Sequence, residues 1–142
     1  MQILIVEDIE QQAAWLTEKL KGLFPRATVR HIRTESGFID GFDEISDTPP
    51  DLVLMDMMLR WADPAPDAPM TPQAYAGFQR AGLRCVNMLQ SHPGTSRVPI
   101  IITTVLEDVD FEPGELPANV SLVTKEVDPS GLFAEIRKRV RA

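Results

Sequence analysis

Several residue types that would indicate a particular class of protein are scarce in this sequence. Its 142 residues include one cysteine, Cys85, which excludes an internal disulfide and a metal site made of several cysteines. No apolar run approaches the roughly 18 residues that a membrane-spanning helix needs. No basic stretch precedes the first apolar run, as a secretion signal would require. We therefore expect a cytoplasmic protein without a membrane partner.

Positive charge is also in the minority. The chain has 14 Lys and Arg against 21 Asp and Glu, and the net charge of −7 opposes non-specific binding to nucleic acid. We therefore expect no direct nucleic-acid partner. A glycine-rich phosphate-binding loop is absent from the sequence as well. Because 44% of the residues are hydrophobic, the chain can form an ordinary core, and we expect a single domain over residues 1–142.

Short apolar runs alternate along the chain with amphipathic segments. Runs typical of strands lie at 2–6, 28–32, 52–56, 99–104 and 120–124, and those at 2–6, 52–56 and 99–104 are typical of strands buried on both faces of a parallel sheet. Apolar residues with helical spacing lie at 9–23, 35–45, 78–90 and 129–141, and Asp128 is expected to cap the last helix. The segment 105–119 contains two prolines and a glycine, so it predicts at most one or two helical turns. The alternation predicts an α/β fold, in which helices cover both faces of a doubly wound parallel sheet.

Polar side chains close the predicted strands. They are Glu7 and Asp8 after the first strand, Asp56 at the end of the third, Thr104 at the end of the fourth, and Lys125 after the fifth. Because parallel strands end at the same edge of a sheet, we expect these residues to lie close together. Three neighbouring carboxylates repel one another unless a cation neutralises them, and a divalent ion such as Mg²⁺ would do so. The chemistry indicated is transfer of a phosphoryl group to a carboxylate.

Four segments resemble the signature segments of a known family, the receiver domain of response regulators in two-component signalling. They are residues 3–8, 52–56, 99–104 and 123–125. The resemblance covers the chain apart from a proline-rich stretch, and it implies a flavodoxin-like, three-layer fold with strand order 2-1-3-4-5. It also implies two kinds of partner. One is a histidine kinase or histidine phosphotransfer protein that supplies the phosphoryl group, and the other is a downstream effector protein.

The resemblance assigns roles to the acidic residues. Asp56 would be the phosphoacceptor. Glu7 and Asp8 would hold Mg²⁺ together with Asp56, and the backbone carbonyl of Met58 would be a further ligand. These roles follow from the resemblance and not from the spacing of the residues alone.

The resemblance also assigns two residues that would contact the phosphoryl group. Lys125 would bind it, and Thr104 would supply the hydroxyl that responds to it. Thr103 is adjacent to Thr104. Thr104 is preferred because the family's usual spacing from the proline before the strand, here Pro99, reaches it.

The sequence departs from the family at several points. An inserted loop at about 59–81 exceeds the usual length by roughly 18 residues, and is either a lid or docking element or a surface excursion. Glu126 replaces the usual proline after the lysine, and Leu122 replaces an aromatic switch residue. The weak helical pattern at 105–119 predicts an atypical fourth helix. Trp15 is expected to be partly exposed, where it either anchors a partner or packs under the inserted loop.

These features predict a signalling phosphoacceptor, not an enzyme. It would accept a phosphoryl group on Asp56 with Mg²⁺ and signal to a partner protein. The alternative is an adaptor that works without phosphorylation and binds its partner through the insertion or an altered output face. Glu126 and Leu122 favour the adaptor, whereas the complete set of acids, threonine and lysine opposes it. A phosphatase is set aside because Met58 occupies the position where such enzymes typically carry a second acid.

Overall fold

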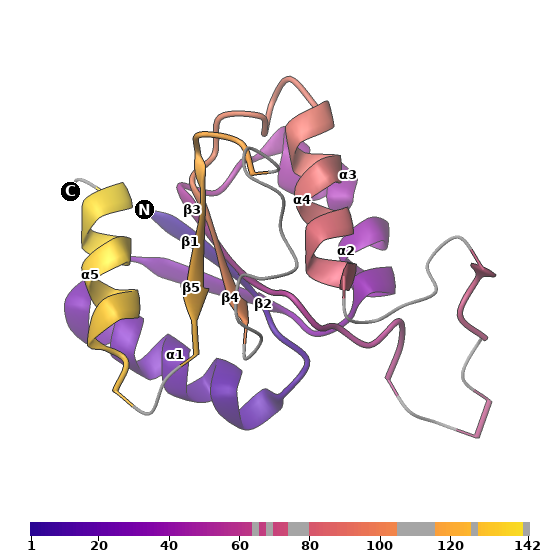
Figure 1. Ribbon diagram of the computed structural model, residues 1–142, viewed down its shortest axis with the longest axis horizontal. Helices are drawn as coiled ribbons and strands as arrows, with labels where there is room; N and C mark the ends of the chain where they lie inside the picture. Colours follow the sequence, from indigo (N-terminus) through magenta and orange to yellow (C-terminus); the bar gives the residue numbers. More distant parts are fainter. Residues whose placement is uncertain (64–65, 68–69, 74–79, 105–115, 126–127, 141–142) are drawn as a thin grey trace.

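Five parallel strands form the centre of the molecule. In the computed structural model, which describes residues 1–63, 66–67, 70–73, 80–104, 116–125 and 128–140, they pair in the order β2-β1-β3-β4-β5 (Figure 1). Their bounds are β1 Gln2–Val6, β2 Thr28–Ile32, β3 Leu52–Asp56, β4 Ile100–Thr104 and β5 Val120–Thr124. The predicted five-stranded parallel sheet and its strand order are confirmed.

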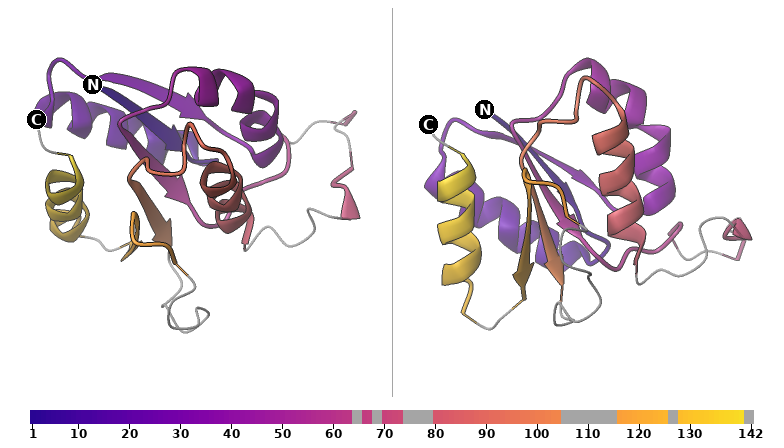
Figure 2. Two further views of the ribbon diagram at one scale, coloured as in Figure 1. Left: turned by 90° about the horizontal axis from the view of Figure 1, so that it is seen from above. Right: turned by 45° about the horizontal axis from the view of Figure 1, so that its top comes forward.

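Helices cover both faces of this sheet. The face that we call the α1–α5 face carries α1 (Glu10–Leu23) and α5 (Ser130–Arg139). The opposite face, the α2–α4 face, carries α2 (Glu35–Asp40), α3 (Phe42–Asp47) and α4 (Ala81–Ser91) (Figure 2). The predicted three-layer, doubly wound arrangement is confirmed.

Each face has its own hydrophobic core. In β1, Ile3 and Ile5 belong to the core under α1 and α5, whereas Leu4 and Val6 belong to the core under the other helices. Successive side chains of a strand point to opposite faces, so a strand covered on both sides has to be apolar at each position. This double burial explains why β1, β3 and β4 appear in the sequence as continuous apolar runs. Because all five strands are parallel, their carboxyl ends lie at one edge of the sheet.

The second predicted helix, at 35–45, differs from the structure, which has two shorter helices there. Thr34 caps α2, because its hydroxyl accepts a hydrogen bond of 3.0 Å from the backbone N–H of Gly37. Gly41 separates α2 from α3, and glycine is a poor helix former because it loses more backbone entropy than other residues. Helical hydrogen bonds still flank the break, from Gly41 N–H to the Gly37 carbonyl and from Ile45 N–H to the Gly41 carbonyl.

The sequence predicts further helix starts at 78 and 129. Within the described residues, helix α4 begins at Ala81; the predicted start at 78 lies outside them. Helix α5 begins at Ser130, one residue later than expected, with Pro129 at the position before it. The carboxylate of Asp128 nevertheless accepts a hydrogen bond of 3.0 Å from the backbone N–H of Ser130. Asp128 therefore satisfies an N–H group at the start of this helix, but it lies one position before the N-cap, which is Pro129 and not Asp128 as predicted.

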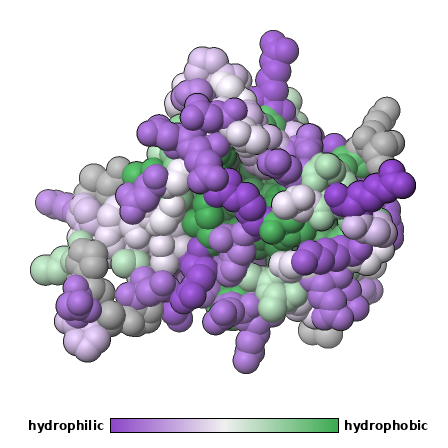
Figure 3. Space-filling view, turned by 180° about the vertical axis from the view of Figure 1, so that it is seen from behind, coloured by the Kyte–Doolittle hydropathy of each residue, from purple (hydrophilic) through white to green (hydrophobic). Residues whose placement is uncertain are grey.

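Some predictions fall outside the described residues. The atypical helix predicted at 105–119 falls mostly on residues 105–115, which lie outside the described part of the chain. Glu126 lies outside it as well. Among the described helices, none is long and apolar enough to cross a membrane. Seen from behind, hydrophobic surface gathers in the middle of the molecule and hydrophilic side chains surround it (Figure 3).

Candidate functional site

Three carboxylates meet at the carboxyl edge of the sheet. Glu7 and Asp8 follow β1, and Asp56 ends β3, which is the neighbour of β1 in the sheet. Each of the three residues offers a carboxylate oxygen, and these oxygens all lie within 4.8 Å of one another. The structure thus brings together the acidic cluster that the strand ends predict.

Burial gives these acids unusual properties. Glu7 is 3% exposed and Asp56 is 6% exposed, whereas Asp8 is only half-buried. Burial disfavours the charged form of Glu7, and the neighbouring Asp56 disfavours it further, so the pKa of Glu7 is raised to about 9. Lys125 acts in the opposite direction and does not offset the rise. At neutral pH, Glu7 therefore holds a proton when no metal ion is bound.

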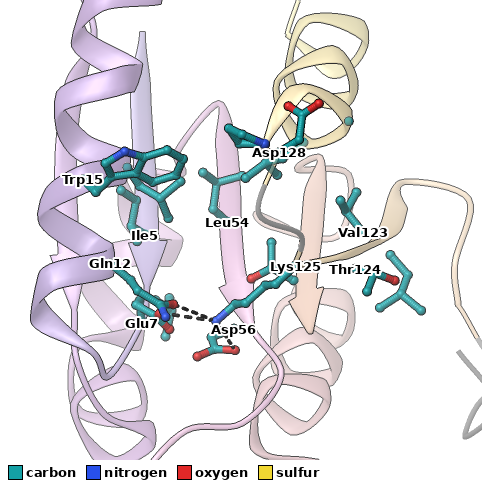
Figure 4. Close-up of a pocket in the computed structure, with 17 residues that line it drawn as sticks. Ile5, Glu7, Gln12, Trp15, Leu54, Asp56, Val123, Thr124, Lys125 and Asp128 are labelled. Atoms are coloured by element: carbon teal, nitrogen blue, oxygen red, sulfur yellow. Dashed lines mark hydrogen bonds and ion pairs between the residues drawn. The ribbon is translucent and has the colours of Figure 1, made fainter. Parts of the chain in front are cut away.

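Lys125 connects the two buried acids to helix α1. Its ammonium nitrogen lies 3.3 Å from Glu7 Oε1 and 3.3 Å from Asp56 Oδ1, and it donates a hydrogen bond of 3.0 Å to Gln12 Oε1 (Figure 4). The lysine follows β5, so its side chain reaches across β4 to the acids at the ends of β1 and β3. Gln12 is a contact that the sequence did not reveal; the only signal is a polar residue in the first turn of the helix that follows β1.

The acidic cluster fits a divalent cation. Glu7 Oε2 is buried and has no hydrogen-bond partner among the described residues. A buried carboxyl oxygen without a partner costs free energy, and the raised pKa of Glu7 reflects the repulsion that its negative charge would meet from Asp56. A cation with oxygen ligands would satisfy this atom and offset the repulsion. The donor set consists of carboxylate oxygens, which Mg²⁺ prefers.

A cavity of about 420 Å³ extends from the acids along the α1–α5 face. Asp56, Lys125 and Thr103 line it at the sheet edge, and Trp15 and Leu132 line it between the two helices (Figure 4). Its walls are mostly apolar beyond the charged end. The cavity therefore joins the acidic cluster to the gap between α1 and α5.

Trp15 is 40% exposed, which confirms that it is partly exposed. Its ring packs against the ring of Phe133 in α5, with 5.9 Å between the ring centroids. The described residues 70–73 of the inserted loop extend away from the sheet beside α2 and α4, and Met70 is 91% exposed (Figure 1). In the described part of the chain, Trp15 thus packs on α5 and not under the loop. Its role as an anchor for a partner stays a prediction.

The two candidate threonines lie on different faces of β4. Thr103 pairs in register with Asp56 of β3, and both line the cavity. Thr104 is 2% exposed, and its carbonyl accepts a hydrogen bond of 2.7 Å from the backbone N–H of Lys125. Because side chains alternate between the two faces along a strand, the sequence could have indicated that Thr103 and Thr104 lie on different faces. Which hydroxyl serves a phosphoryl group stays a prediction.

Gly82 is a site residue that the sequence did not reveal. Its N–H donates a hydrogen bond of 2.8 Å to the carbonyl of Met57, directly after Asp56. A β-carbon at position 82 would collide with the backbone carbonyl of Asp56. The glycine therefore allows α4 to pack against the end of β3. Met58 is half-buried beside this contact, and a metal-binding role for its carbonyl stays a prediction.

Comparisons with known proteins address the fold. Neither a family model nor a curated protein matches the sequence. The structure is similar to the receiver domain of a DNA-binding response regulator from Colwellia psychrerythraea 34H, with a TM-score of 0.68, 22% identity, and coverage of 97% of this chain and 96% of that one. It is also similar to the receiver domain of a signal transduction histidine kinase from Syntrophus aciditrophicus, with a TM-score of 0.67, 23% identity, and coverage of 97% and 88%.

A third similar structure is the chemotaxis protein CheY4 of Vibrio cholerae. The TM-score is 0.67 at 12% identity, and the match covers 98% of each chain. All three matches extend over at least 97% of this chain and at least 88% of the compared chain, and the order of the strands is the one that the resemblance implies. The chain therefore has the fold of the response-regulator receiver domain, as the resemblance of its four segments implies.

Proposed function

We propose that this chain is a phosphoacceptor of a two-component phosphorelay. It accepts a phosphoryl group on Asp56 from a histidine kinase or a histidine phosphotransfer protein and then signals to an effector protein. The observation that carries the proposal is the cluster of Glu7, Asp8 and Asp56 with Lys125 paired to Asp56, at the carboxyl edge of a receiver fold. The cluster combines a nucleophile, a cation site and a fixed positive charge.

The residues that would hold Mg²⁺ are Glu7, Asp8, Asp56 and, through its backbone carbonyl, Met58. When bound, the ion supplies positive charge to the oxygens of the incoming phosphoryl group. The unpartnered oxygen of Glu7 supports this assignment. Because Glu7 holds a proton in the ion-free site, binding of the ion has to release it.

The chain's own residues account for the transfer. A carboxylate oxygen of Asp56 forms a bond to phosphorus while the bond from phosphorus to the donor breaks. With a phosphohistidine donor, the imidazole nitrogen keeps the electron pair of that bond and takes up a proton. Lys125, already 3.3 Å from Asp56 Oδ1, neutralises part of the charge on the phosphoryl oxygens. The hydroxyl of Thr104 donates a hydrogen bond to the transferred group.

Several wider features belong to the same proposal. The chain is a single receiver domain over residues 1–142 that carries an inserted loop at about 59–81. It works in the cytoplasm and has no activity toward a separate substrate beyond its own phosphorylation and dephosphorylation. The length and the 44% hydrophobic content of the chain support the single domain, and its single cysteine supports the cytoplasmic location.

A phosphorylation-independent adaptor is the second candidate. Leu122, where the family carries an aromatic switch residue, is half-buried and packs against the core of the α2–α4 face. Because the side chain of leucine has no polar group at its end, it gains little from exchanging a buried for an exposed rotamer. An adaptor of this kind would bind its partner equally well before and after treatment with a phosphodonor.

Intact mass separates the two candidates. The protein is incubated with Mg²⁺ and acetyl phosphate or phosphoramidate, beside an Asp56→Asn variant. The proposal predicts a gain of one phosphoryl group in the unmodified protein and none in the variant. Absence of the gain with both donors, despite measurable Mg²⁺ binding, would favour the adaptor.

A further inference from the structure

Arg60 brings a second positive charge to the acidic cluster. Its Nε lies 3.8 Å from Asp8 Oδ2, whereas Lys125 pairs with Glu7 and Asp56. The three acids thus have two cations, and each cation serves different members of the cluster. Arg60 comes from the beginning of the inserted loop, four positions after Asp56.

Backbone contacts fix the position of Arg60. The preceding residue, Leu59, is fully buried. The carbonyl of Arg60 accepts a hydrogen bond of 2.9 Å from the N–H of Glu35, and the carbonyl of Trp61 accepts one of 2.9 Å from the N–H of Ser36. The first N–H groups of a helix have no partner within the helix, so these contacts satisfy two groups of α2 that need an acceptor. The start of the loop is therefore part of the packed structure.

Side-chain pairs hold the same region together. Glu35, which is 1% exposed, accepts hydrogen bonds of 2.7 Å from both Nε and Nη2 of Arg84 in α4. Arg33 forms an ion pair of 3.0 Å with Asp63, at the loop side of this frame. The side chain of Arg60, in contrast, is 55% exposed. Its backbone is held, and its guanidinium can change partner.

We propose that Arg60 binds the phosphoryl group that Asp56 receives, a role that rests on the proposed function. The carboxylate of Asp8, where the guanidinium lies, is within 4.8 Å of the carboxylate of Asp56. A guanidinium presents a planar fork of donors that matches the oxygens of a phosphoryl group. When Asp8 coordinates a divalent ion, its charge no longer holds Arg60. The guanidinium then pairs with the phosphoryl oxygens on the side of the cluster that Lys125 does not serve.

The arrangement has two consequences of opposite sign. Without a phosphoryl group, Arg60 competes with the metal ion for Asp8, so removal of its charge tightens Mg²⁺ binding. During transfer, Arg60 stabilises the charge on the phosphoryl oxygens, so removal of the charge slows phosphorylation. An arginine that only paired with Asp8 would produce the first effect without the second.

The test compares Arg60→Gln with a matched control, Arg33→Gln. Both arginines are about half exposed and both are ion-paired, but the partner of Arg33 lies outside the acidic cluster. Calorimetry measures Mg²⁺ affinity, and intact mass measures phosphorylation at saturating Mg²⁺ over a range of phosphoramidate concentrations. For Arg60→Gln we expect about two- to fivefold tighter Mg²⁺ binding and at least about tenfold slower phosphorylation. Arg33→Gln changes neither, and Arg60→Lys, which keeps the charge but not the fork, gives an intermediate rate.

Each other result has a defined meaning. If Arg60→Gln binds Mg²⁺ more tightly and is phosphorylated at the wild-type rate, Arg60 is only a partner of Asp8 and the proposal is wrong. If neither quantity changes, the proposal is wrong as well. A wild-type protein that binds Mg²⁺ but gains no phosphoryl group overturns the proposed function itself. That result is seen before any variant is compared, so the two failures are distinguishable.

Discussion

The two faces of the sheet deliver positive charge to the acidic cluster in different ways. On the α2–α4 face, Arg60 belongs to a segment that is hydrogen-bonded to α2, near the pair formed by the buried Glu35 and the half-buried Arg84. On the α1–α5 face, Lys125 lies at the charged end of a cavity of about 420 Å³ and contacts Gln12. One face is a tightly connected frame, and the other leaves space beside the site. The α2–α4 face therefore holds its arginine through a network of hydrogen bonds, whereas the lysine of the α1–α5 face lies beside open space.

The largest effect is expected from breaking the frame of the α2–α4 face. Glu35→Ala removes the buried carboxylate, 2% exposed, that accepts two hydrogen bonds from Arg84, and we expect a loss of about 3 kcal/mol in the free energy of unfolding. On the other face, Glu135 accepts hydrogen bonds from Ser121 and Arg139, which lower its pKa, but its side chain is 21% exposed. Glu135→Ala should cost only about 0.5 kcal/mol.

Urea denaturation of the two variants measures this contrast. Equal losses would show that the α2–α4 face is not the more tightly connected one. Circular dichroism before denaturation checks that both variants have the native helix content.

Glycine to alanine replacements compare the two faces more directly. At Gly82 of α4, a β-carbon meets the backbone of Asp56, so Gly82→Ala should lower stability by about 2 kcal/mol and slow phosphorylation. At Gly131 of α5, nothing lies within 4 Å of the added carbon. Gly131→Ala should therefore raise stability by about 0.5 kcal/mol, because alanine restricts the unfolded chain.

Thermal unfolding of both glycine variants decides the outcome. A Gly82→Ala protein as stable as the wild type would mean that α4 can move away from β3 at little cost. The frame would then be less rigid than its hydrogen bonds indicate.

The acidic cluster, which lies where the two faces meet, should make the stability of the protein depend on pH. The folded-state pKa of Glu7 is raised to about 9 by burial and by Asp56, above the ordinary value of 4.5. The folded protein therefore keeps a proton that the unfolded chain has lost. Without metal, the contribution of Glu7 to stability is complete below about pH 4.5 and is lost as the pH rises through about 9. Denaturation in EDTA across this range measures the slope.

Glu7→Gln is the control for that dependence. Glutamine cannot lose a proton, so most of the slope should disappear, and Mg²⁺ binding should weaken strongly. In the wild-type protein at pH 7, Mg²⁺ binding should release about one proton, which calorimetry in buffers of different ionisation enthalpy detects. Mg²⁺ binding without proton release would mean that Glu7 is already ionised before the ion binds, which would contradict its raised pKa.

The sheet and the acidic cluster could be predicted because their signals are local. Apolar runs mark the strands, and the residue that closes each run has a known position once the strands are parallel. Glu7, Asp8 and Asp56 therefore came together as expected. The segment of 35–45 was less predictable, because its helical periodicity continues through Gly41 while the structure divides it there.

The remaining parts of the site depend on contacts between distant segments. Gly82 lies far from Asp56 in the sequence. The requirement for a residue without a β-carbon at this position is visible only when α4 packs on β3. Arg60 belongs to a stretch without periodicity, and its position comes from hydrogen bonds to α2. Gln12 is one polar residue among several in its helix. Spacing within the sequence carries no information about these neighbours.

The smallest effect on the phosphorylation rate is expected from replacing the two threonines. These variants test which face of the sheet supplies the hydroxyl. Thr104→Val should slow phosphorylation about threefold, because it removes a hydrogen bond to the phosphoryl group. Thr103→Val should leave the rate within about twofold, although Thr103 lines the cavity with Asp56. Valine keeps the size of the side chain, so the difference between the variants isolates the hydroxyl. The reverse order of rates would place the hydroxyl on the α1–α5 face, beside Lys125, and would leave Arg60 to reach the phosphoryl group from the α2–α4 face.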